Sequence, residues 1–241
     1  MSRPFAAFDI DGTLIRWQLY HAIGDGMAKQ GIIPASEFAR VRKARMNWKR
    51  RSGEDSFRDY ETALIKVFDA ALEDLAVDDL KQIVGRVFDE YKDQVYMYTR
   101  DLIEALRAKN YLLFAVSGSP TLIVELLAQF YGFDASAGTD YPAVDGRFTG
   151  EKLLSLGHKD ELLRGLVEQH GATFSDSIAV GDSEGDIGML ALVEQPIAFN
   201  PSKGLFAHAQ AQHWRVVLER KNMIYQLEPQ NGSYILAQTN S

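Results

Sequence analysis

Three short apolar runs, far apart along the chain, each end in side chains that can carry chemistry. Runs of this length predict buried strands. In an open α/β sheet the carboxyl ends of parallel strands meet at one edge, and ligands bind there. The runs and the polar residues at their ends are FAAFDI (5–10) with Asp9 and Asp11, YLLFAV (111–116) with Ser117, and SIAV (177–180) with Asp182. The sequence therefore predicts one pocket built from all three strand ends.

The stretches around these runs alternate between helix and strand patterns. The predicted helices span 99–109, 120–131, 158–170 and 186–192, and further short strands are predicted at 196–199 and 214–218. Asp145-Gly146 predicts a hairpin turn. Strands that alternate with helices predict an α/β fold, in which helices cover both faces of a mostly parallel sheet.

Residues 17–94 have a helical pattern with no convincing strand, because apolar residues recur there at helical spacing. We therefore expect a catalytic core, residues 1–16 and 95–241, and an inserted α-helical domain, residues 17–94. The role of residues 219–241 stays open, although Asn231-Gly232 indicates a final hairpin.

Charge and composition exclude several classes of protein. The chain of 241 residues carries 33 acidic against 26 basic residues, a net charge of -7, which argues against general nucleic-acid binding. The chain has no cysteine, so disulfides and thiol chemistry are excluded. No uncharged run approaches the ~20 residues of a membrane helix, and the N-terminus lacks the apolar stretch of a signal peptide. We expect a cytoplasmic protein without membrane contact, whose oligomeric state stays open.

Asp9 and Asp11 stand two residues apart, directly after the first predicted strand. Both can reach one small site, and carboxylate oxygens suit Mg²⁺. A carboxylate can also attack phosphorus and form an aspartyl-phosphate. A polar turn with Gly12 at the bend accounts for the same residues without any chemistry, so this segment alone leaves the function open.

Two further segments offer groups for an anion. Ser117-Gly118-Ser119 precedes a predicted helix, where a hydroxyl and free N–H groups bind anions or simply cap the helix. Lys159 lies early in the predicted helix 158–170 and can neutralise a phosphate, although a lone lysine is usually solvated.

The segment after the third strand, Gly181-Asp182-Ser183-Glu184-Gly185-Asp186, places two acids four residues apart. Asp182 can bind a metal ion directly, and Asp186 can stand behind it and orient the site. A turn with helix-capping acids is the alternative.

These four segments, in the order FDIDGTL, AVSGS, Lys159 and VGDSEGD, resemble the haloacid dehalogenase-like superfamily. The resemblance covers residues 1–16 and roughly 95–218, and it implies a Rossmann-like, three-layer core. The helical insert and the hairpin at 138–150 are similar to the phosphoserine phosphatase-like branch (subfamily IB), whose helical C1 caps close over the site. Residues 17–94 would then be such a cap.

The resemblance implies a magnesium-dependent phosphatase that hydrolyses a small phosphorylated metabolite. Asp9 would be the nucleophile, and Asp11 would act as general acid and then general base. Mg²⁺ would lie between Asp9, the carbonyl of Asp11 and Asp182, with Asp186 orienting them. The groups expected around the phosphoryl oxygens are Thr13, Ser117, the N–H of Gly118 and Lys159.

The sequence departs from this branch near the substrate. Phosphoserine phosphatases typically carry Ser at the position of Gly12 and a Glu for the substrate amine, where this chain has Gln18. A neutral amide lacks the charge that pairs with an ammonium group, so phosphoserine is not the expected substrate. The candidate pocket residues are Trp17, Gln18 and His21, and surface placement is the alternative for His21.

Other functions remain open at this point. A phosphotransferase would use the same intermediate, and a non-catalytic phosphate-binding protein would keep the same residues. A carbon–halogen hydrolase is disfavoured because such enzymes usually lack the equivalent of Asp11. The basic stretch of the insert is expected to be a solvated face paired with the acids at 69–79, with an anion-attracting rim as the alternative; its members are Arg40, Arg42, Lys43, Arg45, Lys49, Arg50 and Arg51.

Overall fold

A computed structural model describes residues 2–53, 55–73, 75–153, 158–230 and 232–240. The chain divides into two compact units. The core unit comprises Met1–Gln18, Glu90–Asp140 and Leu154–Ser241, and the helical unit comprises Leu19–Asp89 and Tyr141–Leu153.

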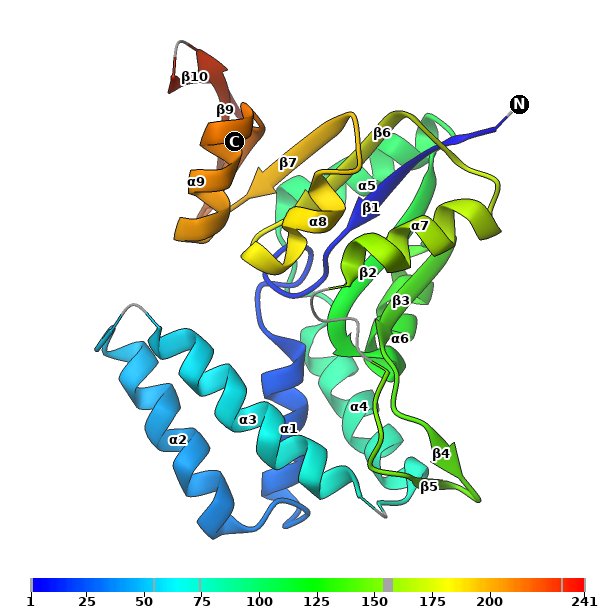
Figure 1. The fold of residues 1–241 in the computed structure, drawn as a ribbon, viewed down its shortest axis with the longest axis vertical. Coiled ribbons are helices and arrows are strands. Elements are labelled where there is room, and N and C mark those ends of the chain that lie inside the picture. The colour runs from blue at the N-terminus through cyan, green and yellow to red at the C-terminus, as the bar shows by residue number, and fades with distance from the viewer. Residues whose placement is uncertain (1, 54, 74, 154–157, 231, 241) are drawn as a thin grey trace. The chain divides into compact units, whose positions relative to one another are not determined.

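One sheet of eight strands organises the described part of the core unit (Figure 1). Its strands are β1 (Pro4–Phe8), β2 (Leu112–Pro120), β3 (Ala135–Thr139), β6 (Thr173–Gly181), β7 (Gln195–Phe199), β8 (Arg215–Arg220), β9 (Met223–Gln230) and β10 (Ser233–Asn240). The spatial order is β10-β9-β8-β7-β6-β1-β2-β3, with parallel pairing from β8 to β3. The six parallel strands thus have the order of a Rossmann fold, which reverses between β1 and β6.

Helices cover both faces of this sheet. The helices are α5 (Met97–Ala108), α6 (Thr121–Tyr131), α7 (Lys159–Gln169), α8 (Ile187–Leu190) and α9 (Lys203–Gln212), with the 3₁₀ turn η1 (Glu184–Asp186) before α8. Phe5 and Phe114 face the side of α7, where Leu163 is fully buried. The alternate residue Phe8 points to the opposite side and meets Phe133, which follows α6. The α/β, three-layer architecture predicted from the sequence is confirmed.

The described residues of the helical unit form four helices and a short hairpin. Its elements are α1 (Leu19–Lys29), α2 (Ala35–Lys49), α3 (Ser56–Leu72), α4 (Val77–Tyr91), β4 (Ala143–Val144) and β5 (Arg147–Phe148). Apolar positions four residues apart on α3, such as Leu64 and Phe68, are fully buried. The helical character predicted for this region follows from that periodicity.

The β4–β5 hairpin belongs to the helical unit, whereas the domain boundaries expected from the sequence placed it in the core. Backbone hydrogen bonds explain the difference, since Phe148 N donates to Leu75 O (3.0 Å) and Val77 N donates to Gly146 O (2.9 Å). The Tyr141 hydroxyl also donates to Asp69 (3.2 Å). The turn itself lies at Asp145-Gly146, both with positive φ, as the sequence predicted.

The C-terminal residues add two antiparallel strands to the sheet edge, β9 beside β8 and β10 beside β9. Residues 219–241 therefore extend the sheet, and Gly232 in the connection between β9 and β10 has φ +79°. Asn231, the other predicted turn residue, lies outside the described residues. Among the described residues, no helix combines the length and apolar character needed to cross a membrane.

Candidate active site

The site begins where β1 and β6 end side by side. Phe8 pairs with Val180 in the parallel ladder, and Asp9 N donates to Val180 O at 3.0 Å. The next residues along these strands therefore bring Asp9 and the Gly181-Asp182 segment to the point where the strand order reverses. In open α/β sheets this point forms the crevice in which ligands bind.

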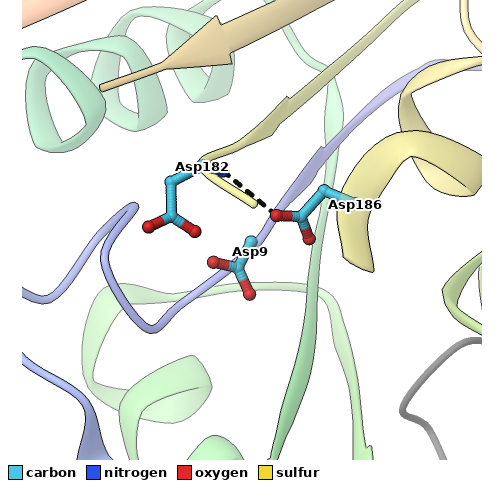
Figure 2. Close-up of side chains that lie close together, drawn as sticks. All are labelled: Asp9, Asp182 and Asp186. Carbon is cyan, nitrogen blue, oxygen red and sulfur yellow. Dashed lines mark hydrogen bonds between the residues drawn. The ribbon is translucent and has the colours of Figure 1, made fainter. Parts of the chain in front are cut away.

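Three carboxylates gather at this point. One oxygen from each of Asp9, Asp182 and Asp186 lies within 4.8 Å of the other two. Figure 2 shows the three side chains converging from the end of β1 and from the loop after β6. Asp9 and Asp186 are almost completely buried, with exposed fractions of 3% and 0%. Their proximity requires compensating positive charge, because buried carboxylates repel one another.

Lys159 supplies part of that charge. Its Nζ donates to Asp9 Oδ1 at 2.7 Å and to Asp186 Oδ1 at 2.6 Å. The lysine is the first residue of α7 and is 7% exposed. Burial disfavours its charge, but Asp186 and Asp9 outweigh burial and raise the pKa of Lys159 above its usual value. The lysine therefore stays protonated.

One lysine does not balance the cluster. Burial, reinforced by Asp186 and Asp11, raises the pKa of Asp9 to about 7 even though Lys159 acts in the opposite direction. Burial, followed by repulsion from Asp9 and Asp186, also raises the pKa of Asp182. Asp9 and Asp182 thus have raised pKa values, because their negative charges are not fully compensated by the buried lysine. Such a pair of carboxylates fits a divalent cation that prefers oxygen ligands.

Asp186 is occupied with holding the loop. While Oδ1 accepts from Lys159, Oδ2 accepts from Asp182 N (3.0 Å), Ser183 N (2.9 Å) and Ser183 Oγ (3.0 Å). Gly181 permits this close approach, because a Cβ at that position would lie 2.5 Å from the Asp186 side chain. The Asp9 and Asp182 carboxylates could thus bind a cation directly, with Asp186 supporting them through the loop.

Ser117 and Asp11 meet on the β2 side of the site. Ser117 Oγ donates to Asp11 Oδ2 at 2.8 Å and accepts from Ser119 N at 3.0 Å. Ser117 is fully buried, and Asp11 is half-buried. Gly118 lies between the two serines, and its carbonyl accepts from Thr139 Oγ1 at 2.7 Å. Side chains therefore join the segment after β1 to the last part of β2.

Two buried hydroxyls near these strand ends lack a hydrogen-bond partner within the described part of the chain. They belong to Thr13 and Ser119, which are 0% and 2% exposed. Thr13 was singled out in the sequence, whereas the Ser119 hydroxyl was not. A buried hydroxyl without a partner is costly unless a ligand satisfies it.

Gly12 shapes the space between these groups. Its φ is +84°, and a Cβ there would lie 2.2 Å from Asp182 Oδ2 and 3.3 Å from Gln18 Nε2. Gln18 and Asp182 therefore both stand close to Gly12. Trp17, which directly precedes Gln18 in the sequence, is half-buried.

His21 belongs to the helical unit, where it is 2% exposed. Its ring lies 4.4 Å from the Tyr60 ring and 6.0 Å from the Phe57 ring, measured between centroids. Burial and the nearby Arg45 lower the pKa of His21 to about 3. The surface placement considered for His21 is wrong, since the side chain is neutral and packed among aromatic rings.

Within the described part of the chain, the basic stretch does not pair with the acids at 69–79 as expected. Among the described residues, Arg40 pairs with Glu37 and Arg45 with Asp25, whereas Asp69 pairs with Lys152 and Asp78 with Lys81. Arg45 also donates to the Tyr60 hydroxyl at 2.8 Å, so it is part of the packed interior rather than of a solvated face.

The chain is similar to known proteins in sequence and in fold. Residues 6–191 match the model of the haloacid dehalogenase-like hydrolase family. A phosphoserine phosphatase of Mycobacterium tuberculosis is 25% identical over 88% of this chain and 69% of its own length, and a histidinol-phosphatase of Neisseria meningitidis is 25% identical over 89% and 98%. The crystal structure of a Bordetella pertussis protein of unknown function has a TM-score of 0.72 at 24% identity, covering 90% of this chain and 98% of that one.

The family match spans all four segments from Asp9 to Asp186, and relatives named as phosphoserine phosphatases agree with the branch that the sequence resembles. The chain belongs to the haloacid dehalogenase-like hydrolase family.

Proposed function

We propose that this protein is a magnesium-dependent phosphatase that hydrolyses a small phosphate monoester through an aspartyl-phosphate on Asp9. The observation that carries the proposal is the buried pair of Lys159 with Asp9, beside Asp182 at the ends of β1 and β6. A carboxylate held next to a fixed cation at a strand end suits attack on a phosphoryl group whose charge must be neutralised.

The reaction needs two displacements. First, an Asp9 oxygen attacks phosphorus, the bond from phosphorus to the ester oxygen breaks, and that oxygen leaves with a proton from Asp11. Water then attacks phosphorus and gives a proton to Asp11. The bond between Asp9 and phosphorus breaks, which releases inorganic phosphate and restores both carboxyl groups. The hydrogen bond from Ser117 to Asp11 supports this role by fixing the carboxyl group.

Asp9 and Asp182 would hold Mg²⁺, with the Asp11 carbonyl as a further ligand. When bound, the ion would neutralise the carboxylates and the phosphoryl oxygens, which lowers the charge repulsion between nucleophile and substrate. Asp186 would keep the Asp182 segment in place through its hydrogen bonds to the loop.

The phosphoryl oxygens would be held by Lys159, Thr13 and the N–H of Gly118, and by Ser117 when its one hydroxyl proton turns from Asp11 to the phosphoryl group. The unsatisfied Thr13 hydroxyl supports this assignment, since a phosphoryl oxygen would give it a partner. Gln18, beside Gly12 and Asp182, would contact the leaving group. Trp17 stays a candidate for the same pocket, and the buried position of His21 gives no support to a contact with substrate.

The names of the relatives suggest two substrates to compare, phosphoserine and histidinol phosphate. Both carry an amine, and the neutral Gln18 offers it no opposite charge. Phosphate release should therefore be measured from a panel that includes these two and monoesters without an amine, with Mg²⁺ and with a chelator. Release only with Mg²⁺ is expected, and efficient release with the chelator present would contradict the proposed cofactor.

A further inference from the structure

The loop that carries Asp182 is held from two sides. On one side, Asp186 accepts hydrogen bonds from the backbone of Asp182 and Ser183. On the other side, Ser202 N donates to Asp182 O at 2.8 Å, so the loop is joined to the residue that caps α9. Ser202 lies outside the four segments on which the family resemblance rests.

The Glu184 side chain adds two hydrogen bonds to this second attachment. Its Oε2 accepts from Ser202 Oγ at 2.7 Å, and its Oε1 accepts from Gly204 N at 3.1 Å. The carboxylate therefore sits at the N-terminus of α9, where free N–H groups and the helix dipole favour negative charge. Ser202 Oγ also accepts from Leu205 N at 3.3 Å, so one hydroxyl serves both the helix cap and Glu184.

The absence of a side chain at Gly204 makes room for the Glu184 carboxylate. A Cβ at position 204 would lie 2.1 Å from Glu184 Oε1 and 2.7 Å from its carboxyl carbon. No side chain larger than that of glycine fits there while the carboxylate keeps its place. Two residues that are 20 positions apart thus form one contact.

We propose that Glu184 is a positioning residue for Mg²⁺, which sets the place of Asp182 by fixing the β6–α8 loop to the N-terminus of α9. The inference rests on the proposed function, because it takes Asp182 as a ligand of the ion. Asp186 restrains the loop from the sheet side and Glu184 from the side of α9. Without Glu184 the loop keeps the Ser202–Asp182 backbone bond but loses the side-chain bonds to Ser202 and Gly204, and Asp182 loses part of its fixed position.

The test is direct calorimetric titration of the purified full chain with Mg²⁺, without substrate. Glu184→Ala should raise the Mg²⁺ dissociation constant about 10-fold, at the lower end of what supporting residues of metal sites contribute, because the side chain is exposed. Gly204→Ala should do the same, since the added methyl displaces the carboxylate. The matched control is Glu125→Ala on α6, which removes an exposed glutamate with the same charge and should stay within about 2-fold of wild type.

The double variant Glu184→Ala with Gly204→Ala makes the test sharper. Once Glu184 is gone, an alanine at 204 meets no carboxylate, so the double variant should bind Mg²⁺ as tightly as Glu184→Ala alone. The inference would be overturned if the two substitutions together raised the Mg²⁺ dissociation constant by the product of their separate effects. It would also be overturned if Glu184→Ala bound Mg²⁺ as tightly as wild type. If wild type itself binds no Mg²⁺, the proposed metal site fails and this inference fails with it, an outcome that the wild-type titration alone identifies.

Discussion

Lys159 and Asp9 form a buried ion pair of 2.7 Å between residues 150 positions apart. The pair joins the first turn of α7 to the end of β1. It places a permanent positive charge next to the carboxylate proposed as nucleophile. Because the same ammonium group also bonds to Asp186, it is the one cation that the described residues place inside the acidic cluster.

Replacing Lys159 by Met should therefore destabilise the protein strongly. Removal of one partner of a buried pair leaves uncompensated charge and typically costs about 3 kcal/mol or more. Urea unfolding in a chelator should report this loss of free energy of unfolding.

Lys152→Met is the matched control for Lys159→Met. Lys152 also pairs with a carboxylate, Asp69, but both side chains are 26% exposed. Solvent screening limits that pair to about 1 kcal/mol or less. Equal losses for the two variants would argue that burial of the Lys159 pair is energetically unimportant.

Gly12→Ala should weaken Mg²⁺ binding by at least about 10-fold. The new methyl would overlap Asp182 Oδ2, which lies 2.2 Å from its position, and must push that carboxylate away. The control is Gly31→Ala, because Gly31 has a similar φ of +77° but nothing within 4 Å. Both variants should lose about 1 kcal/mol from backbone strain, but only Gly12→Ala should change the calorimetric titration with Mg²⁺.

His21 should make the protein less stable in mild acid. Its pKa is lowered from 6.5 in the unfolded chain to about 3 by burial and Arg45. As the pH falls below 6.5, His21 binds a proton in the unfolded state but stays neutral in the folded state. The free energy of unfolding therefore decreases until the pH reaches about 3. Between about pH 7 and about pH 5 this amounts to roughly 2 kcal/mol.

His21→Phe, which keeps a ring against Tyr60, should remove that part of the pH dependence. Denaturant unfolding at the two pH values measures the difference for wild type and variant. His158→Phe replaces an exposed histidine and should keep the wild-type difference. If wild type and His21→Phe lose the same stability in acid, His21 is not the group responsible.

Much of the fold could be predicted because local and global signals agree. The apolar runs in β1, in β2 and in the second half of β6 are buried on both faces of the sheet. Two elements of the core unit were missed. β3 reads ASAGT, small residues without alternation, and Gly138 is required because a Cβ would lie 2.8 Å from Ser119 O. α9 is rich in alanine and glutamine and has little apolar periodicity.

Some residues of the candidate site could be predicted from the local sequence, and others could not. Asp9, Asp11 and Asp182 follow strands, so their convergence can be inferred from the alternation of strands and helices. Nothing in the local sequence of Lys159 distinguishes it from a surface lysine, and only the family resemblance singled it out. Glu184 could not be identified, because its partners at 202 and 204 reach it only through the folding of α9.

The most direct test of the central claim is covalent labelling of Asp9. Substrate carrying radioactive phosphate is mixed with enzyme and Mg²⁺, the reaction is quenched within one turnover, and the label on the protein is located by peptide mapping. We predict an aspartyl-phosphate on Asp9 that requires Mg²⁺ and is absent from Asp9→Asn, which should fold normally but release phosphate at least about 10³-fold more slowly. A labelled or fully active Asp9→Asn protein would contradict the account.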